Sequence, residues 1–226
     1  MNIEMFYYIY LYMKKVIVLL VLLGAVGAYL ALFGTEMFTQ QKDTFVDSRD
    51  GKKYKAVKIG TQTWMAENLN YNASGSKCYD AKPQNCDKYG KLYDWVSAQS
   101  ACPSGWHLPN NDEWDALYRY VDGTSGAESP YESETAGKYL KAKSGWNDYE
   151  GKPGNGEDKF GFSALPGGSG YSYGVFYDIG YDGYWWSASE YVNYNAYSRR
   201  IYYYNDHAIW YYGDRNFLHS IRCLKD

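Results

Sequence analysis

Tyr54, Ala56, Val57 and Ile59 form a short apolar segment interrupted by lysines, and Gly60 separates it from a second short segment at residues 61–65. Short apolar segments bounded by a glycine are typical of strands, so the pattern predicts a β-hairpin with its turn at Gly60. Apolar residues then recur at helical spacing over residues 92–99. We therefore expect a helix there, after a loop over residues 72–91.

Two further segments carry apolar residues on one helical face. The first follows Asn110 and Asn111, either of which can cap a helix whose first turn carries two carboxylates. Its apolar face consists of Trp114, Leu117, Tyr118 and Val121. The second is a shorter helix expected over residues 134–143, with Ser133 as its cap.

The chain changes character after Gly151, where glycine and tyrosine dominate and helical periodicity disappears. Short strands are expected at residues 184–187, 198–204 and 220–224. The order is a hairpin, then helices, then a loop-rich antiparallel section, which is typical of α+β proteins and not of alternating βαβ units. The sequence thus predicts a loop-rich α+β domain with small mixed or antiparallel sheets and two or three short helices.

Residues 16–35 contain no charged side chain. A bilayer core of roughly 30 Å needs about 20 such residues in a helix, so this segment is long enough to span a membrane. Lys14 and Lys15 precede it, and the positive-inside rule then places the residues that follow it outside the cytoplasm. We expect an uncleaved signal anchor, and the small residues at 26–28 leave a cleaved signal peptide as the alternative.

These features divide the chain into four parts. Residues 1–15 are a cytoplasmic segment, or an artefact of gene prediction if translation starts at Met13. Residues 16–35 are the transmembrane signal anchor, and residues 36–44 are a polar linker. Residues 45–226 form the extracytoplasmic domain, in the periplasm or at the cell surface.

Aromatic residues set the composition apart. The 226 residues include 28 Tyr, 8 Trp and 8 Phe, and hydrophobic residues make up 46%, which is enough to fill a packed core. The formal net charge is −3. A nucleic-acid partner requires a basic surface, so this charge argues against one.

The four cysteines agree with export into an oxidising compartment. Cys78, Cys86, Cys102 and Cys223 allow three pairings. We prefer Cys78–Cys86, which closes a short loop, with Cys102–Cys223, which ties the middle of the domain to its end. A zinc site is the alternative, and the absence of a C-x2-C pair weakens it.

Five segments stand out in order along the domain: IGTQTWMAENLNY (59–71), YGKLYDW (89–95), CPSGWHLP (102–109, followed by Glu113-Trp114), WWSASE (185–190) and SIRCLKD (220–226). Together they resemble the Fibrobacter succinogenes major paralogous domain family (FISUMP). The resemblance covers residues 45–226 and does not include the apolar segment before them.

The resemblance implies an exported or surface protein with a C-type lectin-like fold, which sulfatase-modifying enzymes share. In that fold a long disulfide joins the region of one helix to the final strand, which supports Cys102–Cys223. The enzymes that generate formylglycine need a reactive cysteine pair near the C-terminus, and only Cys223 lies there. We therefore expect no catalysis. The tryptophans within the family motifs are expected in the core: Trp64, Trp95, Trp106, Trp114 and Trp186.

No motif indicates a cofactor. The histidines His107, His207 and His219 form no i, i+4 pair, and we expect structural roles for His107 and His219. Calcium is the alternative, because Tyr204-Asn205-Asp206 faintly resembles the Trp-Asn-Asp segment of calcium-dependent lectins. Oxygen ligands for it are available at Asp178, Asp182, Glu190, Asp206 and Asp214.

The tyrosines after residue 170 indicate a recognition surface. Tyrosine combines a flat apolar face, a hydroxyl and low side-chain entropy, and its ring stacks on sugar rings while neighbouring Asn and Asp bind hydroxyls. Alternation within a strand would expose half of these side chains and bury the others. The candidate ligand-binding residues are Tyr191, Tyr194, Tyr197, Tyr202, Tyr204, Asn205, Asp206, Tyr211 and Tyr212.

We therefore expect a membrane-anchored, non-catalytic binding or adhesion module that recognises a polysaccharide or a surface protein. The alternative is a subunit of a surface filament or layer, because an apolar helix before a globular head is also the plan of a pilin. Residues 16–35 contain no glutamate, which argues against a type IV pilin. An enzyme of the sulfatase-modifying type is the least favoured alternative.

Overall fold

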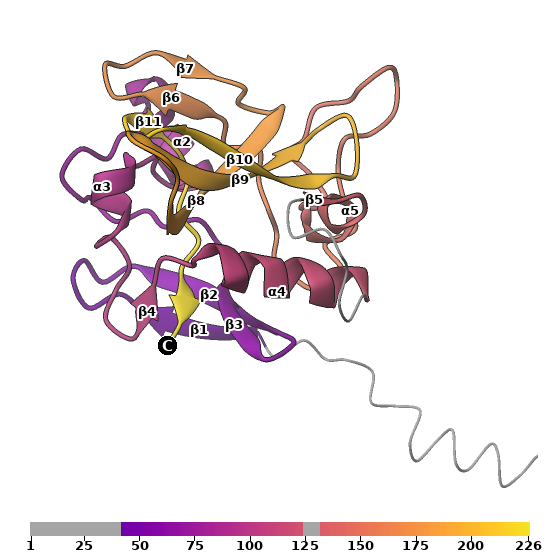
Figure 1. The fold of residues 1–226 in the computed structure, drawn as a ribbon, viewed down its shortest axis with the longest axis horizontal. Helices are drawn as coiled ribbons and strands as arrows, with labels where there is room; N and C mark the ends of the chain where they lie inside the picture. Colours follow the sequence, from indigo (N-terminus) through magenta and orange to yellow (C-terminus); the bar gives the residue numbers. More distant parts are fainter. Residues whose placement is uncertain (1–41, 124–131) are drawn as a thin grey trace, which may run out of the picture. The chain divides into compact units, whose positions relative to one another are not determined.

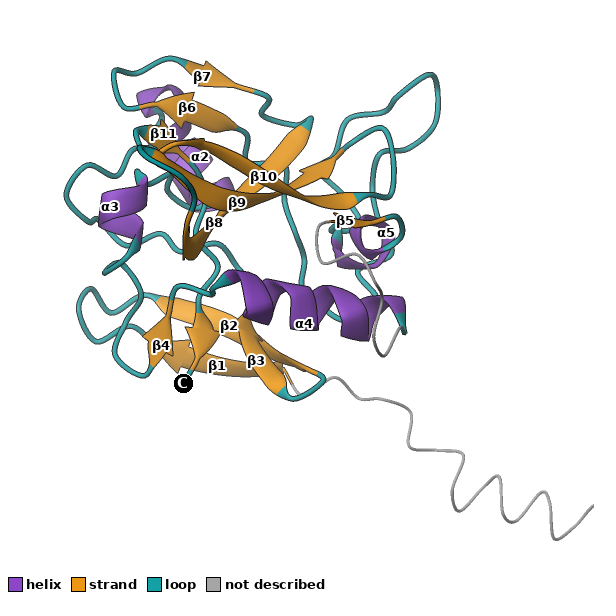
Figure 2. Ribbon diagram, in the orientation of Figure 1, coloured by secondary structure: helices purple, strands orange, loops and turns teal. Residues whose placement is uncertain are grey.

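The computed structural model describes residues 42–123 and 132–226, and these ranges form three antiparallel β-sheets with a few helices (Figures 1 and 2). This is the sheet-rich α+β arrangement that the sequence predicts. The expected cytoplasmic segment and membrane anchor, residues 1–15 and 16–35, lie outside the described ranges. Within those ranges no helix has the length and apolar character that crossing a membrane requires.

The first sheet has five strands in the order β1-β2-β3-β12-β4. Their bounds are β1 (Lys42–Val46), β2 (Lys53–Ile59), β3 (Gln62–Met65), β12 (Leu224–Lys225) and β4 (Trp106–His107). β12 therefore lies between β3 and β4, and the C-terminal segment closes the sheet. β1 begins inside the segment expected as linker 36–44, because Phe45 stacks on Tyr54 of β2, with ring centroids 5.5 Å apart. The folded domain thus starts before residue 45.

The hairpin of β2 and β3 confirms the predicted hairpin, with its turn at Gly60. Gly60 has a φ of +62°, and a Cβ there would approach the ring of Tyr120 to 2.8 Å. Only glycine fits both conditions.

Helix α4 (Asn111–Asp122) lies between this sheet and the next one (Figure 1). The Asn110 side chain accepts from the Glu113 amide at 3.0 Å, and the Glu113 carboxylate accepts from the Asn110 amide at 2.8 Å. This capping box satisfies two backbone donors that a helix start leaves unpaired. The helix buries the predicted face of Trp114, Leu117, Tyr118 and Val121.

The second sheet has the order β5-β10-β9-β8, and the third has the order β11-β6-β7. The second consists of β5 (Glu132–Ser133), β10 (Ala208–Asp214), β9 (Asn195–Tyr202) and β8 (Asp182–Glu190). The third consists of β11 (Phe217–Leu218), β6 (Ser169–Tyr171) and β7 (Phe176–Tyr177). The strands expected at 184–187 and 198–204 thus correspond to β8 and β9, with shifted ends.

The expectations for residues 72–91 and 92–99 are wrong. Residues 72–91, expected as a loop, contain the 3-10 helix η1 (Tyr79–Ala81) and helix α2 (Pro83–Tyr89). α2 has no apolar stripe that the sequence could reveal, and its Cys86 is bonded to Cys78. The helix expected over 92–99 is only α3 (Trp95–Ala98), because Leu92 is extended and pairs with Lys77.

Helix α5 (Ala136–Leu140) is shorter than the expected 134–143. The N-cap position is Thr135 and not the expected Ser133, although the Ser133 hydroxyl accepts from the backbone amide of Ala136, the first helical residue, at 2.8 Å. The strand expected at 220–224 is also wrong. Residues 218–224 are all buried, because the segment crosses the interior and does not lie on a solvent-exposed sheet face. Of the expected strand, only Leu224 belongs to a named strand.

The interior holds a buried guanidinium that links two of the resemblance motifs. Arg222 is fully buried and donates to the Asn68 Oδ1 from Nε at 3.1 Å and from Nη2 at 3.0 Å. It also donates to the carbonyls of Met65, Phe162 and Ser163. Burial lowers the pKa of Arg222 to about 9. Asn68 Oδ1 accepts from Trp185 Nε1 as well, at 2.9 Å, so the network joins three distant segments.

Both preferred disulfides are present, Cys78–Cys86 and Cys102–Cys223. The second joins the segment after α3 to the residue before β12, across 121 positions of sequence. It therefore holds the C-terminal strand in the first sheet.

Candidate binding site

The tyrosines expected to bind a ligand lie on β9, on β10 and in the turns next to them. Tyr212 pairs with Tyr197 across the two strands, and Tyr211 pairs with Ser198. Because successive side chains point to opposite faces, Tyr197 and Tyr212 share one face, whereas Tyr202 and Tyr211 share the other. The structure thus divides the expected site into groups.

The first group lies at the β8–β9 turn. The Tyr191 ring stacks on Tyr212, with centroids 4.3 Å apart, and meets the edge of Tyr197 at 5.0 Å. Tyr197 in turn contacts Trp210 edge-on at 5.2 Å. Tyr212 is 53% exposed, so the group places one solvent-exposed tyrosine ring against half-buried aromatic side chains.

The second group surrounds Arg200. Its guanidinium carbon lies 4.3 Å from the ring centroid of Tyr202, 4.9 Å from Tyr184 and 5.5 Å from Tyr211. Each contact is a cation–π interaction. Arg200 also pairs with Asp182, Nη2 to Oδ2 at 2.6 Å, so its charge is matched and the rings around it are held in place.

A third group continues from Tyr202 towards the loop after α5. Tyr204 lies 5.0 Å from Tyr202 and 5.6 Å from Tyr149, between ring centroids. Tyr203 contacts Tyr149 at 5.5 Å and Tyr181 at 5.0 Å. The sequence pattern does not single out Tyr149 or Tyr181, because they lie in loops with no periodicity, whereas Tyr203 lies within the strand expected at 198–204.

The three groups are linked in one series, which we call the tyrosine track and which passes from one face of the sheet to the other between Tyr211 and Tyr212. Tyr211 and Tyr212 join the second group to the first at 6.3 Å, and Arg200 bridges Tyr202 and Tyr211. The exposed members are Tyr149, Tyr181, Tyr204, Tyr211 and Tyr212. The full track is Tyr181, Tyr203, Tyr149, Tyr204, Tyr202, Tyr211, Tyr212, Tyr191 and Tyr197.

Three of the expected ligand-binding residues lie outside the track. Tyr194 is 82% exposed at the turn, and no ring contact to it occurs among the described residues. Asn205 and Asp206 form the β9–β10 loop. The Lys141 ammonium donates to the Asn205 carbonyl at 2.9 Å and lies 3.8 Å from the Asp206 carboxylate.

This lysine bears on the calcium hypothesis. Its ammonium already occupies the place beside Asn205 and Asp206 that a cation would take. The other oxygen ligands proposed for calcium have protein partners too: Asp178 with Tyr184, Asp182 with Arg200, Glu190 with Arg215 and Asp214 with Asn216. Within residues 42–123 and 132–226, no group of three His, Cys, Asp or Glu side chains is arranged to hold a metal.

A cavity of about 170 Å³ adjoins the track, between the second and third sheets. Its aromatic lining comes from both sheets: Tyr171, Tyr177 and Phe217 on one side, Tyr184 and Tyr211 on the other. Ser169, Asp178 and His219 add polar groups. Tyr211 therefore belongs to both the track and the cavity.

His219 is 1% exposed and stacks parallel to Tyr184, with ring centroids 5.1 Å apart. Both ring nitrogens are shielded from solvent, and within the described chain neither makes a hydrogen bond of good geometry. Burial lowers the pKa of His219 to about 3 and outweighs a weak hydrogen bond with the Leu218 backbone, which raises the pKa. The imidazole is thus neutral at pH 7, with one donor and one acceptor. The sequence indicates no more than a structural role for it, because only the fold places it in a cavity.

The other two histidines hold surface segments together. His107 Nε2 lies 2.9 Å from Glu113, and Nδ1 lies 2.6 Å from Asp226, which ties the start of α4 to the C-terminal segment. This is the structural role that the sequence predicts. His207 lies 2.6 Å from the Glu132 carboxylate.

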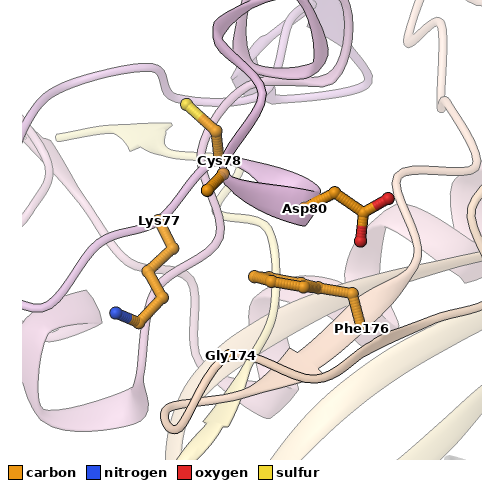
Figure 3. Close-up of a pocket in the computed structure, with 6 residues that line it drawn as sticks. Lys77, Cys78, Asp80, Gly174 and Phe176 are labelled. Atoms are coloured by element: carbon orange, nitrogen blue, oxygen red, sulfur yellow. The ribbon is translucent and has the colours of Figure 1, made fainter.

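A larger cavity, of about 570 Å³, lies beside η1 and the β6–β7 turn, as Figure 3 shows. In that view Lys77 and Asp80 point to opposite sides of the Phe176 ring, and Gly174 borders the opening. Its charges therefore do not converge on a common point. The described residues include no free cysteine, so Cys78 in its wall offers no thiol.

The family model described as the Fibrobacter succinogenes major domain matches residues 57–225. The match includes every strand from β3 to β12 and both disulfides. No curated protein and no solved structure matches the chain.

Proposed function

Because the chain belongs to the Fibrobacter succinogenes major domain family, a group whose name carries no activity, we propose its function from the geometry of its surface. The protein is a non-catalytic binding module that adheres to a polysaccharide through the tyrosine track. It works outside the cytoplasm, anchored in the membrane by residues 16–35.

The continuity of the track is the observation that carries this proposal. Successive centroid distances along it, with Arg200 as the bridge, run from 4.3 to 6.3 Å. A linked, partly exposed series of rings that turns from one sheet face to the other fits an extended, flexible ligand better than a compact one. Sugar rings present apolar C–H faces that stack on tyrosine, and hydroxyls that bind the phenolic oxygens.

Rigid presentation also supports the proposal. Edge-on contacts hold Tyr203 and Tyr197 against their neighbours, and cation–π contacts hold Tyr202. Side chains that are already ordered lose less entropy on binding. An adhesion surface gains affinity from such preorganisation.

The location and the finer fold are part of the proposal. Two disulfides suit an oxidising compartment, and the apolar run at 16–35 suits an anchor. A C-type lectin-like fold is supported by the C-terminal strand β12 in the first sheet and by the long disulfide Cys102–Cys223 next to it.

Retention of the full chain on insoluble polysaccharides tests the proposal. The oxidised protein, in a detergent without sugar groups, is mixed with cellulose, xylan, mannan and peptidoglycan, and the bound fraction is measured against protein concentration. We expect saturable binding to one polymer. The double variant Tyr204→Ala/Tyr212→Ala should lower the affinity at least tenfold, since it removes two exposed rings of the track.

Tyr194→Ala is the matched control, because Tyr194 is more exposed than either residue and lies outside the track. It should bind like the unmodified chain. Equal losses in both variants would assign binding to general surface aromaticity and remove the track from the proposal. Absence of retention on every polymer would overturn the polysaccharide function.

A further inference from the structure

The β9–β10 loop, residues 203–207, joins the two strands that carry most of the tyrosine track, and a buried ammonium contacts it from within the fold. The ammonium belongs to Lys141, the residue that directly follows α5, and the side chain of Lys141 is 2% exposed. It donates to the Asn205 carbonyl at 2.9 Å and to the Tyr202 carbonyl at 3.4 Å, and it lies 3.8 Å from the Asp206 carboxylate. This part of the chain thus directs three oxygen atoms at one internal cation.

We propose that Lys141 is a positioning residue of the tyrosine track: its ammonium occupies the place that a bound metal ion takes in a cation-dependent site, and it fixes the loop that presents Tyr203 and Tyr204. The inference rests on the proposed function and adds that ligand binding along the track requires no metal ion. Two carbonyl oxygens and a carboxylate are ligands that calcium also prefers. The ammonium meets the same kind of oxygen set with its three N–H donors.

The charge of Lys141 and the oxygen atoms around it depend on each other. A buried ammonium is destabilising unless hydrogen bonds and an opposite charge offset the loss of water. Burial lowers the pKa of Lys141, and the Asp206 carboxylate partly opposes that effect. Without the ammonium, the Asn205 carbonyl would face an apolar stem, and a buried carbonyl without a donor is destabilising too. The loop would then turn this carbonyl toward water and lose its present conformation.

Close packing connects Lys141 to the loop. Its Nζ lies 5.5 Å from the ring centroid of Trp146, and a Cβ at Gly156 would come within 2.5 Å of the Lys141 Cβ. A Cβ at Gly137, one turn earlier in α5, would come within 2.6 Å of the Asp206 carbonyl oxygen. The lysine stem is therefore enclosed, and α5 lies directly against the loop. A change at residue 141 is transmitted to the loop and not absorbed by solvent.

The loop carries a junction of the track. Tyr203 meets Tyr149 at 5.5 Å and Tyr181 at 5.0 Å, between ring centroids. Tyr204 meets Tyr202 at 5.0 Å. A loosened loop would therefore separate these rings from the part of the track on β9 and β10. Since side chains that are already ordered lose less entropy on binding, a fixed loop raises the affinity for a ligand that contacts both parts.

Hydrogen exchange of the full oxidised chain tests the positioning role without any ligand. Lys141→Met keeps an unbranched apolar stem and removes the ammonium. Lys138→Met is the matched control on the same helix, because Lys138 is 44% exposed and pairs with Glu157. Mass spectrometry follows the backbone amides of residues 202–207 and those of α4. We expect exchange at residues 202–207 to be at least tenfold faster in Lys141→Met and unchanged in Lys138→Met, with α4 unchanged in both variants.

Chemical rescue separates the ammonium from the space that it fills. In Lys141→Ala, n-propylammonium supplies the atoms that lysine has beyond Cβ, whereas 1-propanol supplies a similar length without the charge. Retention is measured on whichever of cellulose, xylan, mannan and peptidoglycan the unmodified chain binds. Lys141→Ala should bind at least tenfold more weakly, propylammonium should restore most of the lost affinity, and 1-propanol should restore none. The unmodified chain should bind equally well in EDTA.

The outcomes separate this inference from the proposed function. Unchanged exchange at residues 202–207 in Lys141→Met, or equal rescue by 1-propanol and propylammonium, overturns the positioning role of the charge. Loss of retention in EDTA overturns the claim that the track needs no metal ion. If the unmodified chain binds none of the four polymers while Lys141→Met still speeds the exchange, the polysaccharide function fails and the hold of Lys141 on the loop is upheld.

Discussion

The α4 region and the tyrosine track use aromatic residues in opposite ways. Around α4, Trp64 is 0% exposed and Trp114 is 1% exposed, and both lie in motifs that mark the family. In the track, Tyr204 and Tyr212 are 47% and 53% exposed and lie outside those motifs. The difference teaches that aromatic content alone does not indicate a binding surface.

Hydrogen bonding explains the division. An indole has one donor, and the fold satisfies it at most of the buried tryptophans: Trp64 on Gln62, Trp95 on Ser187, Trp146 on Ala164, Trp185 on Asn68 and Trp186 on Tyr93. A phenol both donates and accepts, and at the surface water or a ligand meets both needs. Six of the tryptophans are therefore buried here, whereas tyrosine serves both regions: Tyr93 and Tyr118 are buried, and Tyr204 and Tyr212 are exposed.

Removing each disulfide gives the largest test of how the two regions depend on the rest of the fold. Cys102–Cys223 spans 121 positions, and its loss through C102S/C223S should lower the free energy of unfolding by about 5 kcal/mol in the chain-entropy model. Cys78–Cys86 spans 8 positions, and C78S/C86S should cost about 2.5 kcal/mol in the same model. Urea unfolding of the oxidised chains measures both. Equal losses would contradict the loop-length argument.

A core tryptophan and a track tyrosine give the sharpest direct contrast. Trp64→Ala leaves a cavity in the core and should lower the free energy of unfolding by about 3–5 kcal/mol. Tyr212→Ala removes an exposed ring and should change it by no more than about 0.5 kcal/mol. Thermal and urea unfolding provide the values. A loss above about 2 kcal/mol for Tyr212→Ala would make the track part of the core and break the comparison.

The capping box of α4 makes a smaller contribution to the free energy of unfolding than the buried tryptophan does. Asn110→Ala removes the acceptor for the Glu113 amide and should cost about 1 kcal/mol. Asn110→Asp keeps an acceptor at the same place and adds a negative charge at the helix start, so it serves as the control. In urea unfolding, the unmodified chain and the Asn110→Asp variant should both be more stable than the Asn110→Ala variant. Equal stability of all three chains would show that the cap contributes nothing.

The pH dependence at His107 is the smallest expected effect, because its side chain is 38% exposed. Burial alone would lower its pKa, but hydrogen bonds to Asp226 and Glu113 outweigh burial and raise the pKa above 6.5. The stabilisation is therefore complete below pH 6.5 and disappears as the pH rises through the folded-state pKa. His107→Gln should remove this slope in unfolding experiments at a series of pH values, and an unchanged slope would contradict it.

Strong local signals made part of the fold predictable. Helix α4 combines a cap, an acidic first turn and one apolar stripe, and all of these signals lie on the helix or directly before it. The hairpin at Gly60 combines two short apolar segments with a residue that allows positive φ. Such features need no distant partner, so the sequence alone reveals them.

The site was only partly predictable, since distant contacts create it. Strand alternation indicated that half of the tyrosines on β9 and β10 are exposed, and most of the expected tyrosines lie in the track. Tyr149 and Tyr181 join it from loops that only the tertiary structure brings close. The cavity around His219 could not be predicted for the same reason, because it depends on two sheets that meet around this side chain.

The position of β12 has a consequence for biosynthesis. β12 pairs between β3 and β4, two strands that are synthesised much earlier. Cys102 is likewise synthesised long before its disulfide partner Cys223. The first sheet stays incomplete until residues 223–225 have been translated and Cys223 can bond with Cys102. A nonsense mutation that removes this short segment would therefore leave the first sheet without its β12 strand. The truncated domain would be open to proteolysis, and only full-length chains would resist it.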